Sequence, residues 1–171
     1  MAIYVTSNLQ LGRPNAIKKY KRDFESVDQM NDSLILEWNK IVKPEDTVYH
    51  LGNFAWDPKT AQDSLLRLNG TIKFVIAEHD EALQTLETKG MLRAGVSIIG
   101  QIEPIDSLKV AISYWPLLNW PGKSKGYWSI IGHPDKKHKS DPKTKTINVS
   151  TDLWSNKPQE LERILEIFKD I

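Results

Sequence analysis

Five short polar segments follow apolar, β-branched runs in this sequence, and they hold the residues best suited to chemistry. The segments are Asn8-Leu9-Gln10, Gly52-Asn53, Ala77-Glu78-His79-Asp80, Ser113-Tyr114-Trp115-Pro116 and Gly132-His133-Pro134-Asp135. Segments that leave the carboxyl ends of strands in an open α/β sheet meet in one crevice, so we expect these side chains to line a common site. The amides and imidazoles among them are hydrogen-bond donors for an anionic ligand.

The composition limits which metal and covalent chemistry this site can support. The chain has four histidines and no cysteine, which excludes disulfides, thiolate zinc sites, iron–sulfur clusters and cysteine nucleophiles. A chain without cysteine suits a reducing compartment, and the amino terminus lacks the pattern of a signal peptide, so we expect a cytoplasmic protein.

Charge and hydropathy exclude two further classes of partner. A formal net charge of +1 argues against an extended nucleic-acid surface or a protein that coats an anionic membrane. No apolar run is long enough to span a bilayer, so we expect no membrane partner.

The first half of the chain alternates strands with helices that place these segments. Apolar runs predict strands at 2–6, 47–51 and 71–76, and three- and four-residue spacing of apolar residues predicts helices that begin after Ser26 and Asp57 and a third over 81–89. This order predicts parallel strands joined by right-handed crossovers.

The second half has a different pattern. Short extended runs at 96–99, 101–105 and 108–113 predict a hairpin meander, with further strands at 127–131 and 146–149 and a last helix after Pro158. We therefore expect a single domain over residues 1–171, an α/β protein built as a layered α/β sandwich with mixed β-sheets.

The order of the five segments resembles the calcineurin-like metallophosphoesterase family, in particular its small single-domain bacterial and phage members. Those proteins read D-x-H, G-D, G-N-H-D, S-H-x-P and G-H-x-H at successive strand ends. The stretches Lys43–Val48 and Asn148–Trp154, with Lys157-Pro158, are also similar to the same members. The resemblance covers nearly the whole chain, implies a calcineurin-like phosphoesterase fold and leaves a phage origin open.

The resemblance implies a two-metal site, yet most of the corresponding ligand positions are substituted here. Amides stand at the aspartate and histidine positions of the first two motifs, Glu78 at the asparagine, Tyr114 at the fourth-motif histidine and Asp135 at the last one. Of the implied metal ligands only His133 keeps the family residue, while the third motif also retains its histidine and aspartate as His79 and Asp80. His79 is the position that the resemblance assigns to the acid that assists the leaving group.

An amide at the bridging position is unsuited to two metal ions. A bridging ligand needs anionic oxygens, whereas Asn53 offers one neutral carbonyl oxygen and two N–H donors. We therefore predict a catalytically inactive pseudoenzyme with no catalytic residue, no resident metal and no cofactor. One alternative stays open: Glu78, His133 and Asp135 could hold a single Mg²⁺, Mn²⁺ or Ca²⁺ ion.

The remaining features favour binding of a phosphorylated small molecule, with a nucleotide or cyclic nucleotide first among the candidates. A lysine-rich loop follows the last motif, Arg13 follows the first, and aromatic residues adjoin several motifs. The predicted ligand-binding residues are Asn8, Gln10, Arg13, Asn53, Glu78, His79, Tyr114, His133, Asp135 and Lys136. The alternatives are a rewired single-ion phosphodiesterase or phosphatase and a protein-interaction scaffold, and a homo-oligomer is also left open.

Overall fold

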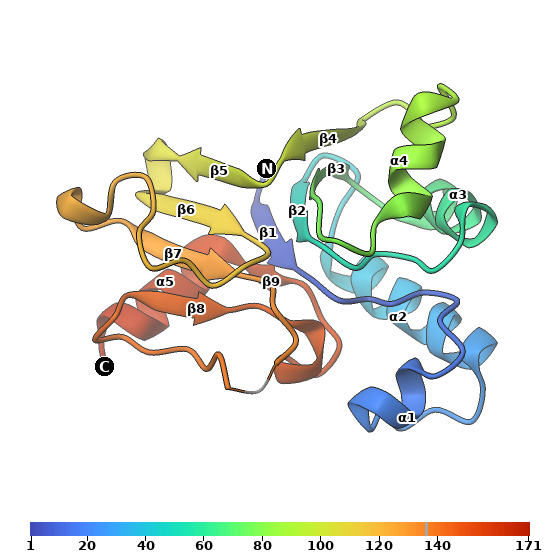
Figure 1. Ribbon diagram of the computed structural model, residues 1–171, viewed down its shortest axis with the longest axis horizontal. Helices are drawn as coiled ribbons and strands as arrows, with labels where there is room; N and C mark the ends of the chain where they lie inside the picture. Colours follow the sequence, from blue (N-terminus) through green and yellow to red (C-terminus); the bar gives the residue numbers. More distant parts are fainter. Residues whose placement is uncertain (136) are drawn as a thin grey trace.

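A five-stranded sheet with the order β4-β3-β2-β1-β9 forms one layer of the protein (Figure 1). The computed structural model describes residues 1–135 and 137–171. Strands β1 (Ile3–Thr6), β2 (Thr47–Leu51), β3 (Thr71–Val75) and β4 (Val96–Gly100) are parallel, and the short β9 (Gln159–Glu160) runs antiparallel to β1.

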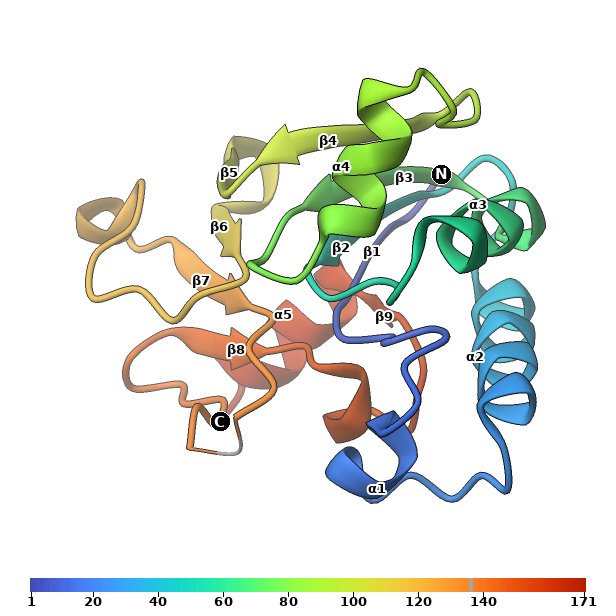
Figure 2. The same ribbon diagram turned by 45° about the vertical axis from the view of Figure 1, so that its right-hand side comes forward.

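Three helices cover one face of this sheet: α2 (Val27–Ile41), α3 (Pro58–Arg67) and α4 (Glu81–Thr88). Figure 2 shows them on the side of the sheet that faces away from the second layer. Trp38 of α2 and Phe74 of β3 lie in the core between helices and sheet. The predicted helix starts are confirmed, because Ser26 Oγ accepts from Gln29 N at 3.1 Å and Asp57 Oδ1 accepts from Thr60 N at 2.9 Å.

A second, four-stranded sheet has the order β5-β6-β7-β8. Its strands are β5 (Ile102–Ile105), β6 (Val110–Ser113), β7 (Trp128–Ile131) and β8 (Thr146–Asn148), with β5 antiparallel to β6 and the others parallel. A second core contains Leu51 and Val75 of the first sheet, Ile112 and Ile130 of the second, and Leu165 of α5 (Leu161–Lys169). The protein is thus a layered α/β sandwich with mixed sheets, as the sequence predicted.

The predicted hairpin meander is wrong in part. Strand β4 does not pair with β5; it lies parallel to β3 and returns through α4, so it completes the first sheet. Of the three runs in the predicted meander, only the two that form β5 and β6 make an antiparallel pair. Gly100 and Gln101 separate two short extended runs, and the sequence pattern cannot tell a hairpin turn from a change of sheet.

Several short elements were not predicted. They are α1 (Ala16–Tyr20), β9, and the 3₁₀ helices η1 (Asp106–Leu108), η2 (Lys123–Lys125) and η3 (Thr151–Leu153). Elements of two to five residues carry too few apolar positions to show a period. Among the described residues, none of the helices combines the length and the apolar character needed to cross a bilayer.

Candidate functional site

The ends of β1 and β2 lie side by side, and their backbones hold the first two polar segments together. Asn8 N donates to Gly52 O at 3.0 Å, and Gln10 N donates to Asn53 O at 3.0 Å. Asn8, Gln10 and Asn53 have φ values of 59°, 56° and 58°, in the left-handed region that asparagine tolerates better than most residues. This conformation turns each segment sharply at the strand end.

Gly52 is required by close packing at this turn. A Cβ atom there would lie 2.6 Å from Ala77 Cβ and 2.7 Å from the Tyr114 ring, and its φ is 86°. The glycine therefore lets the second, third and fourth segments approach one another.

The carboxylate of Asp80 ties the second segment to the third. It accepts hydrogen bonds from Asn53 N at 3.0 Å, Phe54 N at 3.0 Å and Ala77 N at 2.7 Å. Burial raises the pKa of Asp80, while the three backbone N–H groups act in the opposite direction. The retention of Asp80 in the third motif thus has a structural reason that does not involve a metal.

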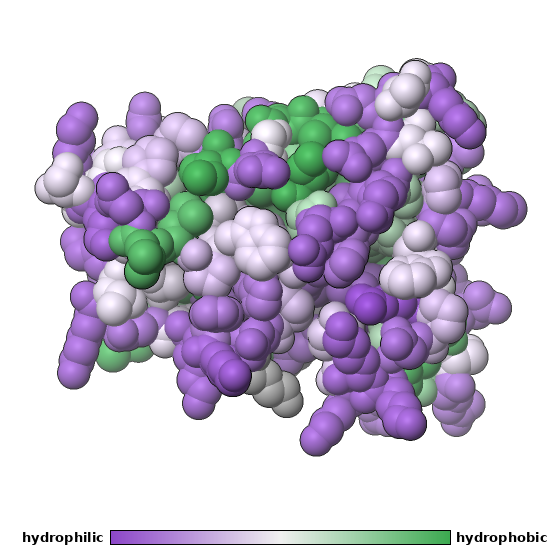
Figure 3. Space-filling model, in the orientation of Figure 1, coloured by the Kyte–Doolittle hydropathy of each residue, from purple (hydrophilic) through white to green (hydrophobic). Residues whose placement is uncertain are grey.

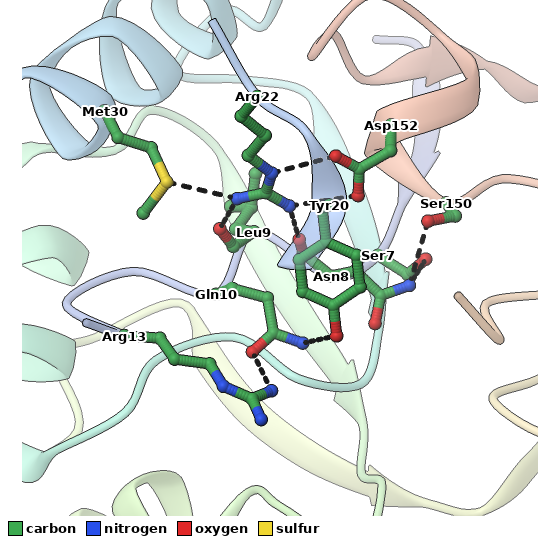
Figure 4. A network of polar contacts seen from close by, with 10 residues as sticks. All are labelled: Ser7, Asn8, Leu9, Gln10, Arg13, Tyr20, Arg22, Met30, Ser150 and Asp152. Atoms are coloured by element: carbon green, nitrogen blue, oxygen red, sulfur yellow. Dashed lines mark hydrogen bonds and ion pairs between the residues drawn. The ribbon is translucent and has the colours of Figure 1, made fainter. Parts of the chain in front are cut away.

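The side chain of Asn8 lies at the centre of the site and is fully buried. Its Nδ2 lies 3.0 Å from Ser7 Oγ and 3.1 Å from Ser150 Oγ, and it also contacts the carbonyl oxygen of Gly132. Figure 4 shows Asn8 between Ser7 and Ser150. An amide that donates to three oxygens from the ends of β1, β7 and β8 joins the two sheets at this edge.

Asn53 and Tyr114 complete what we call the amide network, defined as Asn8, Asn53 and Tyr114. Asn53 Nδ2 donates to Asn8 Oδ1 at 2.9 Å and to Tyr114 Oη at 3.0 Å. Burial raises the pKa of Tyr114 to about 12, so its hydroxyl stays protonated near neutral pH. Asn53 and Tyr114 are 4% and 3% exposed, and Asn53 Oδ1 has no hydrogen-bond partner among the described residues.

The buried guanidinium group of Arg22 stabilises the turn that follows β1. Arg22 donates to Leu9 O at 2.7 Å and to Asn8 O, and it forms an ion pair with Asp152 at 2.8 and 3.1 Å (Figure 4). Arg22 and Asp152 were not predicted as site residues, because both lie outside the five segments. Asp152 falls in the stretch Asn148–Trp154, but nothing in the sequence links it to Arg22.

Gln10 and Arg13 lie at the rim. Gln10 Nε2 donates to Tyr20 Oη at 3.2 Å, and Gln10 Oε1 accepts from Arg13 Nη1 at 2.9 Å (Figure 4). The Arg13 guanidinium stacks on Trp56, 5.0 Å from the ring centroid. Arg13, the positive charge near the first motif, therefore lies at the rim of the site.

A cavity of about 540 Å³ opens beside these residues. Its lining includes Lys19, Tyr20, His133, Asp135 and Ser150. The His133 ring lies 5.2 Å from that of Tyr114, which connects the cavity wall to the amide network. Partial burial, followed by the nearby His138, lowers the pKa of His133, so its imidazole is a neutral hydrogen-bonding group near pH 7.

The other predicted residues lie at the surface. Glu78 and His79 are exposed, with Glu78 Oε1 3.4 Å from His79 Nε2. Asp135 is also exposed, and its Oδ1 accepts from Lys137 N at 2.9 Å. The predicted ligand-binding residue Lys136 lies outside the described residues.

The residues present do not fit a two-metal centre. At the position that the resemblance assigns to the bridging carboxylate, Asn53 presents N–H groups that already donate to Asn8 and Tyr114. Over the described ranges, no three His, Cys, Asp or Glu side chains are grouped so that they could hold a metal ion. The single-ion alternative at Glu78, His133 and Asp135 stays a prediction.

Comparison with known proteins places the chain in a family. No family model matches it. The uncharacterized protein MJ1445 from Methanocaldococcus jannaschii is 33% identical over an alignment 181 positions long, which covers 98% of this chain and 91% of that protein. The chain belongs to the MJ1445 family. Its arrangement of elements is also similar to the crystal structure of a protein of unknown function, AQ665 from Aquifex aeolicus, with a TM-score of 0.73 over 97% of this chain and 98% of that one.

The two comparisons support different conclusions. The likeness to AQ665, at 20% identity, shows the fold alone. Membership of the MJ1445 family adds no activity, since MJ1445 is described only as uncharacterized. What the site can do in this member of the MJ1445 family therefore has to be argued from its own geometry.

Proposed function

We propose that this protein is a metallophosphoesterase-like pseudoenzyme that binds a phosphorylated small molecule, a nucleotide or cyclic nucleotide, at the carboxyl ends of its strands. Two packed mixed sheets with polar segments at that edge support the likeness to the calcineurin-like fold. Calcineurin-like membership itself rests on the five motifs in the sequence.

The observation that carries the proposal is the pair of hydrogen bonds from Asn53 Nδ2 to Asn8 Oδ1 and Tyr114 Oη. Two-metal hydrolysis needs negative charge between the ions, and here a neutral amide points hydrogen atoms at its neighbours. Amides at Asn8 and Asn53, where the resemblance implies aspartates, also place two fewer carboxylates at the strand ends, which lowers the repulsion that an anion would meet there.

Binding is supported by the donors that surround the cavity beside His133. Lys19 supplies an ammonium group, Ser150 a hydroxyl, and Tyr20 and His133 rings against which a ligand can pack. The volume of about 540 Å³ lies within the usual range for small-molecule sites.

The test is a thermal-shift screen of the purified protein with nucleotides, cyclic nucleotides and sugar phosphates. A ligand at a hundred times its Kd stabilises a folded protein by about 2.7 kcal/mol, which gives a clear rise in Tm. We expect at least one phosphorylated compound to raise Tm, and the matching unphosphorylated compound to have no effect.

Metal analysis and a hydrolysis assay separate this proposal from the enzyme alternative. We expect no turnover of bis-para-nitrophenyl phosphate with added Mn²⁺. Stoichiometric metal, together with turnover that is lost on Glu78→Gln, would establish the single-ion enzyme instead. A panel without any stabilising phosphorylated compound would overturn the binding proposal.

A further inference from the structure

A cavity of about 630 Å³ lies on the other side of the segment that joins β7 to β8. Its polar wall contains Lys123, Lys137, Lys139, Lys143 and Lys145, and we call this cavity the lysine pocket. Hydrophilic side chains cover this part of the molecule in Figure 3, over the segment between β7 and β8. Five lysine side chains thus line one hollow of a protein whose net charge is only +1. Two of their ammonium groups, those of Lys123 and Lys145, donate to backbone carbonyl oxygens.

The negative charge in the lysine pocket does not balance these lysines. Asp141 is the carboxylate in its described lining, and its Oδ1 accepts from Lys143 N at 2.9 Å, a backbone contact that shapes the turn. None of the ion pairs found among the described residues involves any of the five lysines. Uncompensated like charges in one hollow repel each other, and a bound polyanion relieves that repulsion.

The lining of the pocket also includes apolar and aromatic side chains. Leu118 is 96% exposed at its edge, and Trp120 and Tyr127 line it as well. Lys123 Nζ lies 4.5 Å from the centroid of the Trp120 ring, which places a cation beside an aromatic surface. A pocket lined by both ammonium groups and apolar or aromatic side chains suits a ligand with a charged end and a flat, less polar end.

We propose that the lysine pocket binds the polyphosphate group of a nucleoside di- or triphosphate, with the base against the wall formed by Leu118, Trp120 and Tyr127. This inference rests on the proposed function in that it names the ligand class and the place where its phosphates are recognised. Lysine ammonium groups form charge-assisted hydrogen bonds with phosphate oxygens. The cavity volume lies within the range of small-molecule sites.

The lysine pocket adjoins the cavity beside His133. His138 lines the lysine pocket, and its ring lies 5.1 Å from that of His133. Asn148 Nδ2 donates to both His133 O and His138 O, at 2.8 and 2.7 Å, and so holds these two residues near each other. A nucleotide bound through its phosphates in the lysine pocket would therefore lie next to the site at the strand ends.

The experiment is calorimetric titration of ATP, AMP and adenosine into the wild-type protein and two double variants. The test variant is Lys139→Glu with Lys143→Glu, and the matched control is Lys43→Glu with Lys89→Glu, two exposed lysines outside the lysine pocket. We expect affinity to fall from ATP to AMP to adenosine. The test variant should weaken ATP binding at least tenfold, and the control should change it less than twofold.

Two results of the nucleotide titrations would overturn the inference in distinguishable ways. ATP binding that is equal in the test variant and the wild type would remove the lysine pocket but leave the proposed function in place. Failure of every phosphorylated compound to bind the wild type would remove both.

The titration also includes a single-stranded oligonucleotide, because Lys143 and Lys145 line a neighbouring hollow together with Lys109 and Lys169. Binding of the oligonucleotide tenfold tighter than ATP would replace the small-molecule ligand with a nucleic acid and overturn the inference.

Discussion

The amide network and the lysine pocket lie close together on one edge of the molecule, yet they differ in burial, in charge and in the partners of their hydrogen-bond donors. The amide network is buried and neutral, and the N–H groups of Asn53 donate to neighbouring oxygens. The lysine pocket is open and charged, and its ammonium groups form no ion pair with a carboxylate among the described residues. In a two-metal phosphoesterase, metal ions would organise the strand ends. Here hydrogen bonds within the protein do so, and in our proposal the cations of the lysine pocket recognise the ligand.

This comparison predicts that stability is concentrated in the buried region. Asp80→Ala should have the largest effect, because it leaves the N–H groups of Asn53, Phe54 and Ala77 without their acceptor. We expect a loss of about 4 kcal/mol in the free energy of unfolding, measured by urea denaturation. The control is Asp63→Ala, which removes an exposed ion pair with Lys59 and should cost about 0.5 kcal/mol or less. Equal losses for the two variants would contradict the assigned role of Asp80.

Arg22→Met tests the buried ion pair below the turn. The Arg22 side chain is 1% exposed and that of Asp152 is 18% exposed, so the substitution leaves a mostly buried carboxylate unpaired and two carbonyl oxygens without donors. We expect a loss of about 3 kcal/mol in urea denaturation. The double variant Arg22→Met, Asp152→Leu should recover part of that loss. If the double variant instead lost the sum of the free energies that the two single variants lose, Arg22 and Asp152 would not act as a pair.

His50 gives the pH dependence of the buried region. It is fully buried beside Phe54 and Phe74, and burial lowers its pKa to about 3. In the unfolded chain His50 has a pKa of about 6.5, so as the pH falls the unfolded state binds the proton first. The contribution of His50 to the free energy of unfolding is therefore complete above that pH and is lost as the pH falls toward about 3. Between pH 7 and pH 5 the free energy of unfolding should fall by about 2 kcal/mol from this residue.

The check is urea denaturation at both pH values for the wild type and His50→Phe. The variant should show the smaller change, by about 2 kcal/mol. The lowered pKa of His133 adds a change of the same sign to both proteins, so it cancels in the difference. Identical pH profiles would mean that His50 is not buried in its neutral form.

Tyr114→Phe has the smallest expected effect on stability, and it tests whether the ligand contacts the amide network or the lysine pocket. It removes the hydroxyl that accepts from Asn53 Nδ2, while the second bond of that amide, to Asn8 Oδ1, remains. We expect a loss of about 1 kcal/mol in stability, with ATP affinity unchanged within twofold, because the phosphates bind at the lysine pocket. A large loss of ATP affinity with normal stability would place the ligand at the amide network instead.

Long elements were predictable from the sequence because their apolar periods extend over many residues. The helices that start after Ser26 and Asp57 are examples, and the structure confirms them as α2 and α3. The sheet to which β4 belongs was not predictable, since its pairing with β3 depends on the α4 crossover rather than on its own residues.

The site was predictable only where a strand end marks it. Asn8, Asn53 and Tyr114 were singled out as segments that follow strands, and the structure brings them together. Arg22 and Asp152, which are 130 positions apart, form their ion pair through the fold and leave no local pattern. Glu78 and His79 were also singled out, but the third segment turns their side chains to the surface, away from the amide network.

The most direct test of the central claim is ³¹P NMR of ATP mixed with the purified protein. Spectra are first recorded in metal-free buffer. The mixture is then incubated with Mn²⁺ for hours, and the metal is chelated in each sample before it is measured. The account predicts that the phosphate signals shift or broaden saturably in metal-free buffer, and that ATP is recovered intact after incubation with Mn²⁺. Release of inorganic phosphate or pyrophosphate at a rate proportional to the protein concentration would contradict the claim that the site binds without hydrolysis, and unchanged ATP signals in metal-free buffer would contradict the claim that it binds at all.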